Sequence, residues 1–381
     1  MRKGTALAAG CLALLCLAGN GRALVIDHHC TDLSLVPEYW IRQARSTIKL
    51  TYGHTSHGSQ VVTGMEALLD SFPVYQFFND HAYYRYGGGN PQAPDTVMSF
   101  WDYVPGGDLG NPNWTAWAGL TDTMLSNANG AYTIYPHLRN LVVWSWCGQV
   151  SWADSGNIAT YLSLMTQLEL AYPGATFVYM TSHLDGTGAS GNLNLRNNQI
   201  RSYCQANDKL LFDFADIESY DPDGLVNYMP LYADDNCDYD SSGYARNWAQ
   251  SWIARNPDHE LARLAAACGD CAHSQRLNCI LKGRAFWWMV ARLAGWEGPS
   301  GVAGEKPQPL TAQGFTVWPD PVRSLSELRF SAPGSYRIFN ALGQLVAECD
   351  GRTPPNKMVR AGHYFVREQT SGACRRVAVV R

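Results

Sequence analysis

The chain has 381 residues, of which 46% are hydrophobic, 12% aromatic and 16% charged, and this composition excludes a disordered, collagen-like or coiled-coil protein. The formal net charge is −4, but residues 24–305 carry 15 basic and 28 acidic side chains, whereas residues 306–381 carry 11 basic and 5 acidic ones. We therefore expect two modules of opposite charge, and the acidic main module argues against a nucleic-acid partner.

The first 23 residues predict a cleaved export signal. Arg2 and Lys3 precede an apolar stretch from Ala6 to Ala18, and Gly21-Arg22-Ala23 supplies the small residues that a signal peptidase recognises. The apolar stretch is too short for a transmembrane anchor. We expect a signal peptide over residues 1–23 and a secreted or cell-surface protein.

Nine cysteines follow this signal, and export places them in an oxidising environment where thiols tend to pair. Cys349 and Cys374 are alone in the basic tail and are expected to pair with each other. The main module holds an odd number, so at least one of its thiols is free: Cys30, Cys147, Cys204, Cys237, Cys268, Cys271 and Cys279.

Short apolar runs alternate with amphipathic segments from Thr47 to Trp296, a pattern typical of a largely parallel sheet wrapped by helices. Residues 84–117 are rich in Gly, Pro, Asn and aromatic residues and predict a long loop over one end of the sheet. Functional residues of such sheets lie after the carboxyl ends of the strands. Strands are expected over residues 47–52, 138–144, 175–180 and 210–214, and helices over residues 60–71, 158–171, 195–205 and 280–293.

Changes in composition divide the chain into two domains and a linker. Residues 24–297 form the expected α/β domain, and residues 298–309 form a linker of Gly, Pro and Lys without apolar periodicity. Residues 310–381 contain short alternating runs separated by turn residues, which predicts a small all-β sandwich.

A candidate nucleophile follows the earliest of the expected strands, in Gly53-His54-Thr55-Ser56-His57-Gly58-Ser59. A serine at this point lies near the free amides of a helix N-terminus, which favour negative charge and suit a nucleophile whose attack creates an oxyanion. The alternative is that Ser56 or Ser59 only caps the helix.

A candidate base lies far downstream, in Asp270-Cys271-Ala272-His273. On one turn of chain, a carboxylate three residues before an imidazole can fix the tautomer of the ring and stabilise its protonated form. The alternative is a polar surface turn.

The order of these features resembles the SGNH, or GDSL-like, hydrolase superfamily, over roughly residues 25–296. In that superfamily the nucleophilic Ser follows the first strand, a Gly and an Asn on the next loops bind the oxyanion, and Asp-x-x-His completes the triad. The resemblance implies a flavodoxin-like three-layer α/β/α fold, with Ser56 as nucleophile, His273 as base and Asp270 as the orienting carboxylate.

The sequence departs from the family pattern in two blocks. The first reads Gly-His-Thr-Ser-His-Gly instead of Gly-Asp-Ser, so Ser59 remains a second candidate nucleophile. The third reads Trp146-Cys147-Gly148-Gln149 instead of Gly-x-Asn-Asp, so we expect the Gln149 amide to act as one oxyanion donor. The other expected donor is the Gly110 amide.

Further polar and aromatic groups are expected around this site. We assign His54, His57, His183 and Asp185 to substrate binding, and His183 is also an alternative base. The run Asp213-Phe214-Ala215-Asp216-Ile217-Glu218 is expected to fix loops by hydrogen bonding or to hold a cation. Several aromatic residues are expected at the rim, where they would stack on sugars unless they belong to the core: Tyr83, Tyr84, Tyr86, Trp101, Tyr103, Trp114 and Trp117.

The tail resembles the carboxy-terminal sorting domains of type IX secretion substrates. The resemblance rests on Trp318-Pro319-Asp320-Pro321, the segment from Tyr336 to Val346, the segment from Ala361 to Arg367 and a basic end. It implies that the outer-membrane secretion machinery is a partner. A plain β-sandwich accessory domain is the alternative.

The sequence therefore predicts a secreted serine esterase without a cofactor, acting on a small-molecule ester or an acylated polysaccharide. Zinc is an alternative, because Cys268, Cys271, His273 and Cys279 have a spacing that a zinc site could use. A metal-dependent polysaccharide-active enzyme that uses the His and carboxylate loops, and a non-catalytic carbohydrate-binding or adhesive surface protein, also remain open.

Overall fold

The computed structural model divides the chain into two compact units, residues 1–300 and residues 301–381, which are described separately. The structure describes residues 23–79, 97–127, 139–241 and 243–299 of the first unit, and residues 317–319, 322–331, 333–340, 345–355, 357, 359–368 and 374–380 of the second. Three sequence expectations lie outside the described residues: the signal peptide before residue 23, the rim tyrosines Tyr83, Tyr84 and Tyr86, and the linker from residue 300 onward. The expected pairing of Cys349 with Cys374 is wrong, because the Cys349 thiol is free.

A seven-stranded, all-parallel sheet forms the centre of the first unit, with the strand order β1-β7-β6-β5-β2-β4-β3. The prediction of an α/β domain with a parallel sheet is confirmed, and four of the strands match expected runs. The strands are β1 (Val25–Ile26), β2 (Lys49–Gly53), β3 (Phe77–Asn79), β4 (Met98–Asp102), β5 (Leu141–Trp144), β6 (Thr176–Met180) and β7 (Leu211–Phe212).

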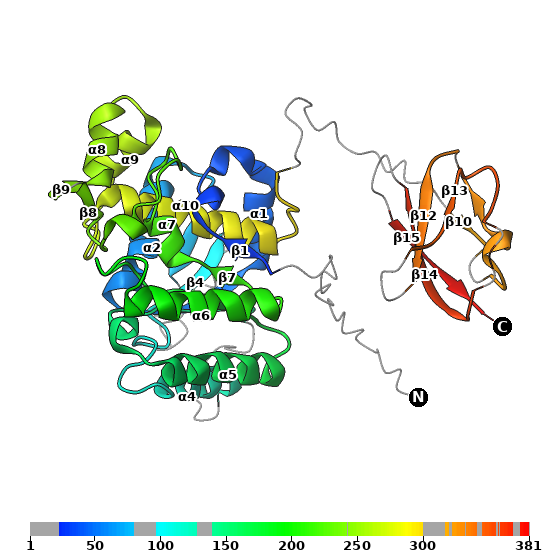
Figure 1. The fold of residues 1–381 in the computed structure, drawn as a ribbon, viewed down its shortest axis with the longest axis horizontal. Coiled ribbons are helices and arrows are strands. Elements are labelled where there is room, and N and C mark those ends of the chain that lie inside the picture. The colour runs from blue at the N-terminus through cyan, green and yellow to red at the C-terminus, as the bar shows by residue number, and fades with distance from the viewer. Residues whose placement is uncertain are drawn as a thin grey trace, which may run out of the picture. The chain divides into compact units, whose positions relative to one another are not determined.

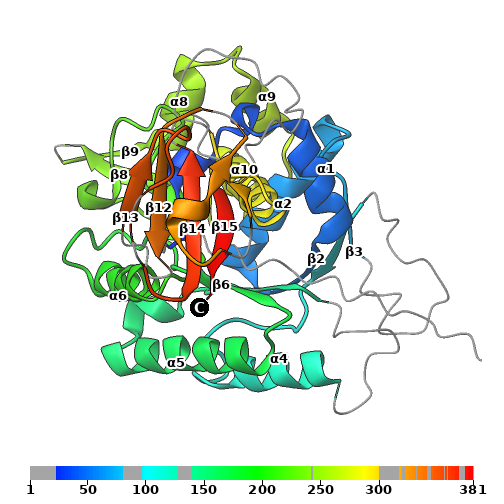
Figure 2. The same cartoon turned by 90° about the vertical axis from the view of Figure 1, so that its right-hand side faces the viewer.

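Both faces of the sheet are buried, which explains why its strands read as continuous apolar runs. In β5, Leu141 and Val143 enter one core cluster, whereas Val142 and Trp144 enter the other. Figures 1 and 2 show α4, α5 and α6 on one face, and α1, α2 and α10 on the other. The helices are α1 (Glu38–Thr47), α2 (Ser56–Ser71), α4 (Ala116–Ser126), α5 (Ser155–Ala171), α6 (Asn192–Ala206), α7 (Phe214–Glu218), α8 (Trp248–Arg255), α9 (Glu260–Ala267) and α10 (Arg276–Leu293).

Strand β2 lies at the point where the chain reverses its direction across the sheet. From β2 the chain continues to β3 and β4 on one side, and from β5 it continues to β6 and β7 on the other. Strands β2 and β5 are paired up to Gly53 opposite Trp144, so the carboxyl ends of these two strands are adjacent. Ligands of open α/β sheets bind at such a switch point.

The expected loop over residues 84–117 is wrong in part, because it contains the whole of β4 and the start of α4. In β4, Phe100 packs into one core cluster and Trp101 into the other, so these aromatic residues belong to a buried strand. The strand that precedes Ser56 is also the second in the chain, because the two-residue β1 comes before it.

Helices α2 and α10 touch through glycines. A Cβ atom on Gly64 would lie 1.8 Å from the carbonyl oxygen of Cys279, and one on Gly283 would lie 2.4 Å from the carbonyl carbon of Gly64. The two backbones therefore pack directly against each other. This crossing holds α2, which begins at Ser56, next to the helix that follows His273.

The remaining elements of the first unit are short. Strands β8 and β9 form an antiparallel hairpin, and the 3-10 turns lie in the connections. Their bounds are β8 (Asp238–Ser241), β9 (Tyr244–Asn247), η1 (His28–Cys30), η2 (Leu33–Leu35), η4 (Gln149–Trp152) and η5 (Met229–Leu231). Within the described residues, no helix has the length and apolar character needed to cross a membrane.

The second unit consists of small antiparallel sheets around its own apolar core. A four-stranded sheet has the order β13-β12-β14-β15, and β10 pairs with β11. The strands β12 and β14 are two of the short alternating runs expected in residues 310–381. The elements are β10 (Val317–Trp318), η6 (Leu325–Glu327), β11 (Arg329–Phe330), β12 (Tyr336–Asn340), β13 (Leu345–Cys349), β14 (Gly362–Glu368) and β15 (Cys374–Val379).

Candidate functional site

Ser56 is the first residue of α2, directly after the turn that leaves β2. The first turn of α2 packs closely against the turn before it and against the residue after β5, because a Cβ atom on Gly58 would lie 2.3 Å from His54 Cβ and 2.2 Å from the Ser145 hydroxyl. The amide of Ser59 makes the first helical hydrogen bond, to the carbonyl of Thr55. The amides before it have no acceptor within the helix, so they give the helix N-terminus its affinity for negative charge.

His273 reaches Ser56 from the other end of the domain. Its Nε2 lies 2.9 Å from Ser56 Oγ, although the two residues are 217 positions apart. The second candidate serine, Ser59, instead donates its hydroxyl hydrogen bond to the Ser56 carbonyl at 2.7 Å. The structure thus places Ser56, and not Ser59, against the imidazole.

The backbone of His273 is in the left-handed region, with φ of 61°. A non-glycine residue in this region costs on the order of 1 kcal/mol, and such residues concentrate at functional sites. The surrounding chain stabilises this conformation: Cys271 forms a disulfide with Cys279, and the Gln60 side chain donates to the Ala272 carbonyl at 2.6 Å.

A buried ion pair also restrains the loop that carries Ala272 and His273. Lys282 and Glu218 are fully buried and lie 3.1 Å apart. Lys282 also donates to the Gln60 side-chain oxygen, so the chain of contacts runs from α7 through α10 to the residue next to His273. An ion pair without solvent holds its geometry closely, since breaking it would leave an uncompensated buried charge.

Asp270 does not make the expected contact with His273. Its carboxylate accepts a hydrogen bond from Arg276 at 2.9 Å, and its side chain is fully exposed. The expectation assumed that residues 270–273 form one turn with both side chains on the same side. The positive φ of His273 departs from such a regular turn, and its ring contacts Ser56 while Asp270 binds Arg276.

Gly110 and Gln149 are brought together, as expected for two groups of one site. A Cβ atom on Gly110 would lie 3.2 Å from Gln149 Cβ. The Gln149 side-chain oxygen accepts from the Cys147 amide at 2.7 Å, and its nitrogen lies 3.5 Å from an Asp108 oxygen. Asp108 in turn accepts from the Thr55 hydroxyl at 2.5 Å, which links this group to the residue before Ser56.

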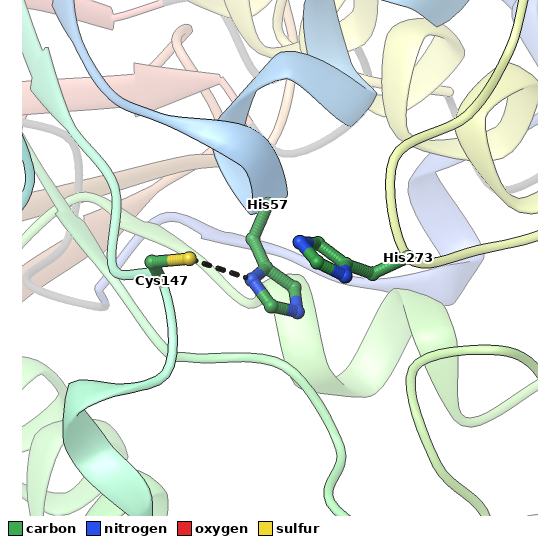
Figure 3. A group of neighbouring side chains, drawn as sticks. All are labelled: His57, Cys147 and His273. Carbon is green, nitrogen blue, oxygen red and sulfur yellow. Dashed lines mark hydrogen bonds between the residues drawn. The ribbon is translucent and has the colours of Figure 1, made fainter.

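A second chain of polar contacts starts at Cys147, which follows β5. Cys147 Sγ lies 3.1 Å from His57 Nδ1 (Figure 3). His57 Nε2 lies 2.9 Å from a carboxylate oxygen of Asp235. Ser56 Oγ is 3.3 Å from the same sulfur. Asp235 was not predicted as a site residue, because it lies 178 positions from His57 and belongs to no recognisable motif.

These contacts shift the pKa values of all three groups. Burial would lower the pKa of His57, but its hydrogen bonds to Asp235 and Cys147 outweigh burial and raise it to about 9. The hydrogen bond to His57 lowers the pKa of Cys147 to about 6, against the effect of burial. Burial would raise the pKa of Asp235, but the hydrogen bond to His57 lowers it. Near neutral pH the three groups are therefore carboxylate, imidazolium and thiolate.

The His57 ring contacts two other imidazoles, stacked on that of His273 and tilted against that of His183. The ring of His273 lies 4.6 Å away at an interplanar angle of 16°, and the ring of His183 lies 4.2 Å away at 31°. Burial, and then the charge of His57, lower the pKa of His183 to about 4. His183 is therefore a neutral ring, and its Nδ1 lies 3.0 Å from the Ser182 hydroxyl.

The other expected substrate-binding residues have protein partners. His54 is buried, with Nε2 2.7 Å from Asp102 and Nδ1 3.0 Å from the Thr55 carbonyl. Asp185 accepts from the hydroxyls of Ser151 and Thr187. Of the four residues assigned to substrate binding, His57 contacts His273 and His183 contacts His57, whereas His54 and Asp185 stabilise neighbouring loops.

Disulfides were expected among the cysteines of the main module, and in the described part of that module one forms, between Cys271 and Cys279. This bond removes two thiols from the zinc set considered above, and Cys268 is free and buried. Cys147 is free and partly exposed, whereas the remaining free thiols of the module, Cys30, Cys204 and Cys237, are buried.

Cys147, His57 and His273 have donor atoms within 4.8 Å of one another, as do His57, His183 and Asp235. A thiolate with two imidazoles is a donor set that zinc accepts. An imidazole binds a metal ion in the plane of its ring, however, and the His57 and His273 rings are stacked in nearly parallel planes. In this arrangement the two rings are stacked, so one ion could bind both only after one ring rotated.

The aromatic residues expected at the rim divide into core and surface. Trp101 and Trp117 are fully buried in the core cluster beneath α4 and α5, so they cannot stack on a sugar. Trp114 is partly buried against the same cluster, and Tyr103 is 53% exposed. Trp152 was not among the predicted rim residues, although its side chain is 71% exposed. The Trp152 ring lies close to Gly148, the residue after Cys147, because a Cβ atom on Gly148 would lie 3.2 Å from that ring.

The carboxylate run after β7 fixes loops, one of its two expected roles. Asp213 pairs with Arg201 at 2.7 Å, Asp216 with His28 at 2.5 Å, and Glu218 with Lys282. His28 and Asp216, with Asp27, also form a third group with donor atoms within 4.8 Å of one another.

Comparisons with protein-family models, with curated proteins and with solved structures found no match to this chain. The assignment of a function therefore depends on the geometry around Ser56.

Proposed function

We propose that this chain is an exported hydrolase of SGNH-like fold that cleaves carboxylic esters, with Ser56 as the nucleophile and His273 as the general base. The observation that carries the proposal is the 2.9 Å contact between Ser56 Oγ and His273 Nε2 at the carboxyl end of β2. A hydroxyl within hydrogen-bonding distance of an imidazole, beside free helix amides, is the arrangement that acyl transfer requires.

In the proposed reaction, Ser56 Oγ attacks the ester carbonyl while His273 Nε2 accepts its proton. The amide of Ser56 at the helix N-terminus faces the developing oxyanion, and Gly110 and Gln149 are the further donors we propose. His273 then returns the proton to the leaving alcohol. Water, activated by the same imidazole, hydrolyses the acyl-enzyme and releases the acid.

The proposed substrate class is an acyl group on a polysaccharide. Trp152 supports it, because this exposed ring lies on η4 immediately after the loop that holds Cys147. A flat exposed indole binds the apolar face of a sugar ring. Export would follow from the amino-terminal signal and the tail, and we propose that the antiparallel second unit is the sorting domain that engages the outer-membrane secretion machinery.

The test compares two serines that each begin a helix. Ser56→Ala is expected to lower the turnover of a chromogenic alkyl ester by at least about a thousandfold and to abolish labelling by a fluorophosphonate. Ser155→Ala is the matched control, because Ser155 is the first residue of α5 and lies outside the site, and it should retain both. Circular dichroism verifies that each variant is folded.

Three results would overturn this proposal in different directions. Full activity in Ser56→Ala together with loss in Ser59→Ala would move the nucleophile to Ser59. Activity that survives Ser56→Ala and disappears with a chelator would favour a metal-dependent enzyme. A folded protein that neither hydrolyses esters nor reacts with the phosphonate would favour an adhesive or carbohydrate-binding protein.

A further inference from the structure

The contacts of Cys147 form a relay that does not use His273. The thiol faces one nitrogen of His57 at 3.1 Å (Figure 3). Asp235 binds the other nitrogen at 2.9 Å. A nucleophile, a base and a carboxylate that orients the base are the three parts of a catalytic triad. Ser56 and His273 have the first two parts, but Asp270, the expected third, bonds to Arg276.

The electrostatic surroundings favour a thiolate at Cys147. Asp235, His183 and His273 face His57, Glu218 contributes at longer range, and the balance raises the pKa of His57. The imidazolium then holds the pKa of Cys147 near 6. By contrast, burial raises the pKa of the other free thiols of the module, at Cys30, Cys204, Cys237 and Cys268. Cys147 is therefore the thiol with nucleophilic character.

We propose that Cys147 is a second catalytic nucleophile at this site and that it transfers and hydrolyses acyl groups delivered as thioesters. The inference rests on the proposed function only in placing an acyl group at this end of the sheet. Cys147 Sγ and Ser56 Oγ are 3.3 Å apart, so the carbonyl carbon that one can attack lies within reach of the other.

The reaction uses the groups that touch Cys147. The thiolate attacks the thioester carbonyl carbon, a new carbon–sulfur bond forms and the original one breaks. The departing thiolate takes the proton from His57 Nδ1 and leaves as a thiol. Water then attacks the acyl-Cys147 carbon while His57 accepts its proton, which releases the carboxylic acid and restores the thiolate–imidazolium pair.

Leaving-group ability selects the substrate class. Thiolates leave more readily than alkoxides, so an intermediate formed by Cys147 on an alkyl ester mostly expels Cys147 again. On a thioester both candidate leaving groups are thiolates, and the intermediate can proceed in either direction. Ser56 and Cys147 are therefore expected to differ in the acyl donors that they accept.

The experiment is done in the Ser56→Ala protein, so that its outcome does not depend on the serine mechanism. This protein is incubated with an acetyl aryl thioester, quenched in acid and mapped by mass spectrometry. We expect an acetyl group on Cys147 that neutral hydroxylamine removes, and no such adduct in the Ser56→Ala/Cys147→Ala protein. Absence of the adduct, or its presence on another residue, would overturn the proposal.

Alkylation by iodoacetamide provides a second test, in which the pH profile is measured on the unsubstituted protein. The rate at Cys147 is expected to have its inflection near pH 6, and Asp235→Asn is expected to lower the rate at that pH by about tenfold or more. Asp102→Asn is the matched control, because it removes the carboxylate from His54 instead of His57 and should change the rate by less than about twofold. An ordinary thiol profile, or equal effects of the two variants, would refute the relay.

The two proposals fail separately. If Ser56 is not a nucleophile, the phosphonate fails to label it while the thioester adduct still forms on Cys147. If the relay is wrong, Cys147 behaves as an ordinary thiol while the phosphonate still labels Ser56.

Discussion

Replacing Gly64 by alanine tests whether the contact between α2 and α10 assembles the site. The added Cβ atom would lie 1.8 Å from the Cys279 carbonyl oxygen and 3.0 Å from the Gly283 amide, and both are backbone atoms that no rotamer change can remove. Overpacking typically costs 1–3 kcal/mol, and the backbone contact places this variant at the upper end, about 3 kcal/mol. For a domain of this size that corresponds to a loss of roughly 6–12 °C in Tm. Helix α2 begins at Ser56 and α10 follows His273, so a shift between the two helices would also separate the hydroxyl from the imidazole. We therefore expect the rate of proton transfer from Ser56 to His273, and with it the turnover rate, to fall.

The matched control is Gly119→Ala in α4, where a Cβ atom would meet nothing within 4 Å. Both substitutions gain the same helix propensity, up to about 1 kcal/mol, so the difference between them isolates the packing cost. The assay is thermal unfolding followed by circular dichroism, together with ester hydrolysis below the transition. If Gly64→Ala is as stable as Gly119→Ala, the close helix crossing does not exist and the argument that it positions the site is refuted.

Two further predictions concern the substrate and the pH dependence of stability. Trp152→Ala is expected to raise KM for an acetylated polysaccharide by about fivefold, the loss of roughly 1 kcal/mol of stacking, while KM for a small ester stays within about twofold; equal changes for both substrates would contradict sugar stacking. Burial would raise the pKa of Asp216, but the hydrogen bonds that Asp216 accepts from His28 lower that pKa. The ionised carboxylate therefore stabilises the fold at pH values above its ordinary pKa of about 3.9. This stabilisation is lost as the pH falls through the lower pKa of the folded state. The Tm difference between the unsubstituted protein and Asp216→Asn should therefore be large at pH 6 and shrink as the pH falls toward 3, and a difference that grows on acidification would contradict this account.

The sequence was informative about the fold wherever burial on both faces made a strand continuously apolar. The runs ending at Tyr52, Trp144, Met180 and Phe214 correspond to β2, β5, β6 and β7. Strand β4 was missed because Gly, Pro and Asn surround it and because Trp101 resembled a surface aromatic residue, although it is buried. Strand β1 has two residues, too few for any periodicity.

The candidate site was predictable in part. Ser56 and His273 carry local signals, a serine between glycines after a strand and an imidazole before a helix, and they lie together. The partner of Asp270 was not predictable, because the spacing of three positions fixes an orientation only if the backbone between the two residues is a regular turn. Asp235 has no local signal at all, since only the three-dimensional path of the chain brings it to His57.

The pairing of β2 with β5 holds the two proposed nucleophiles more rigidly than the proposed base is held. Ser56 and Cys147 each follow, by three residues, a position at which these two central strands are paired, Gly53 opposite Trp144. His273, by contrast, is carried by a turn that a disulfide and a few side-chain bonds restrain. Local opening of that turn would take the imidazole away while leaving the hydroxyl and the sulfur in place, so the molecule would lose its serine chemistry well before it lost its sheet.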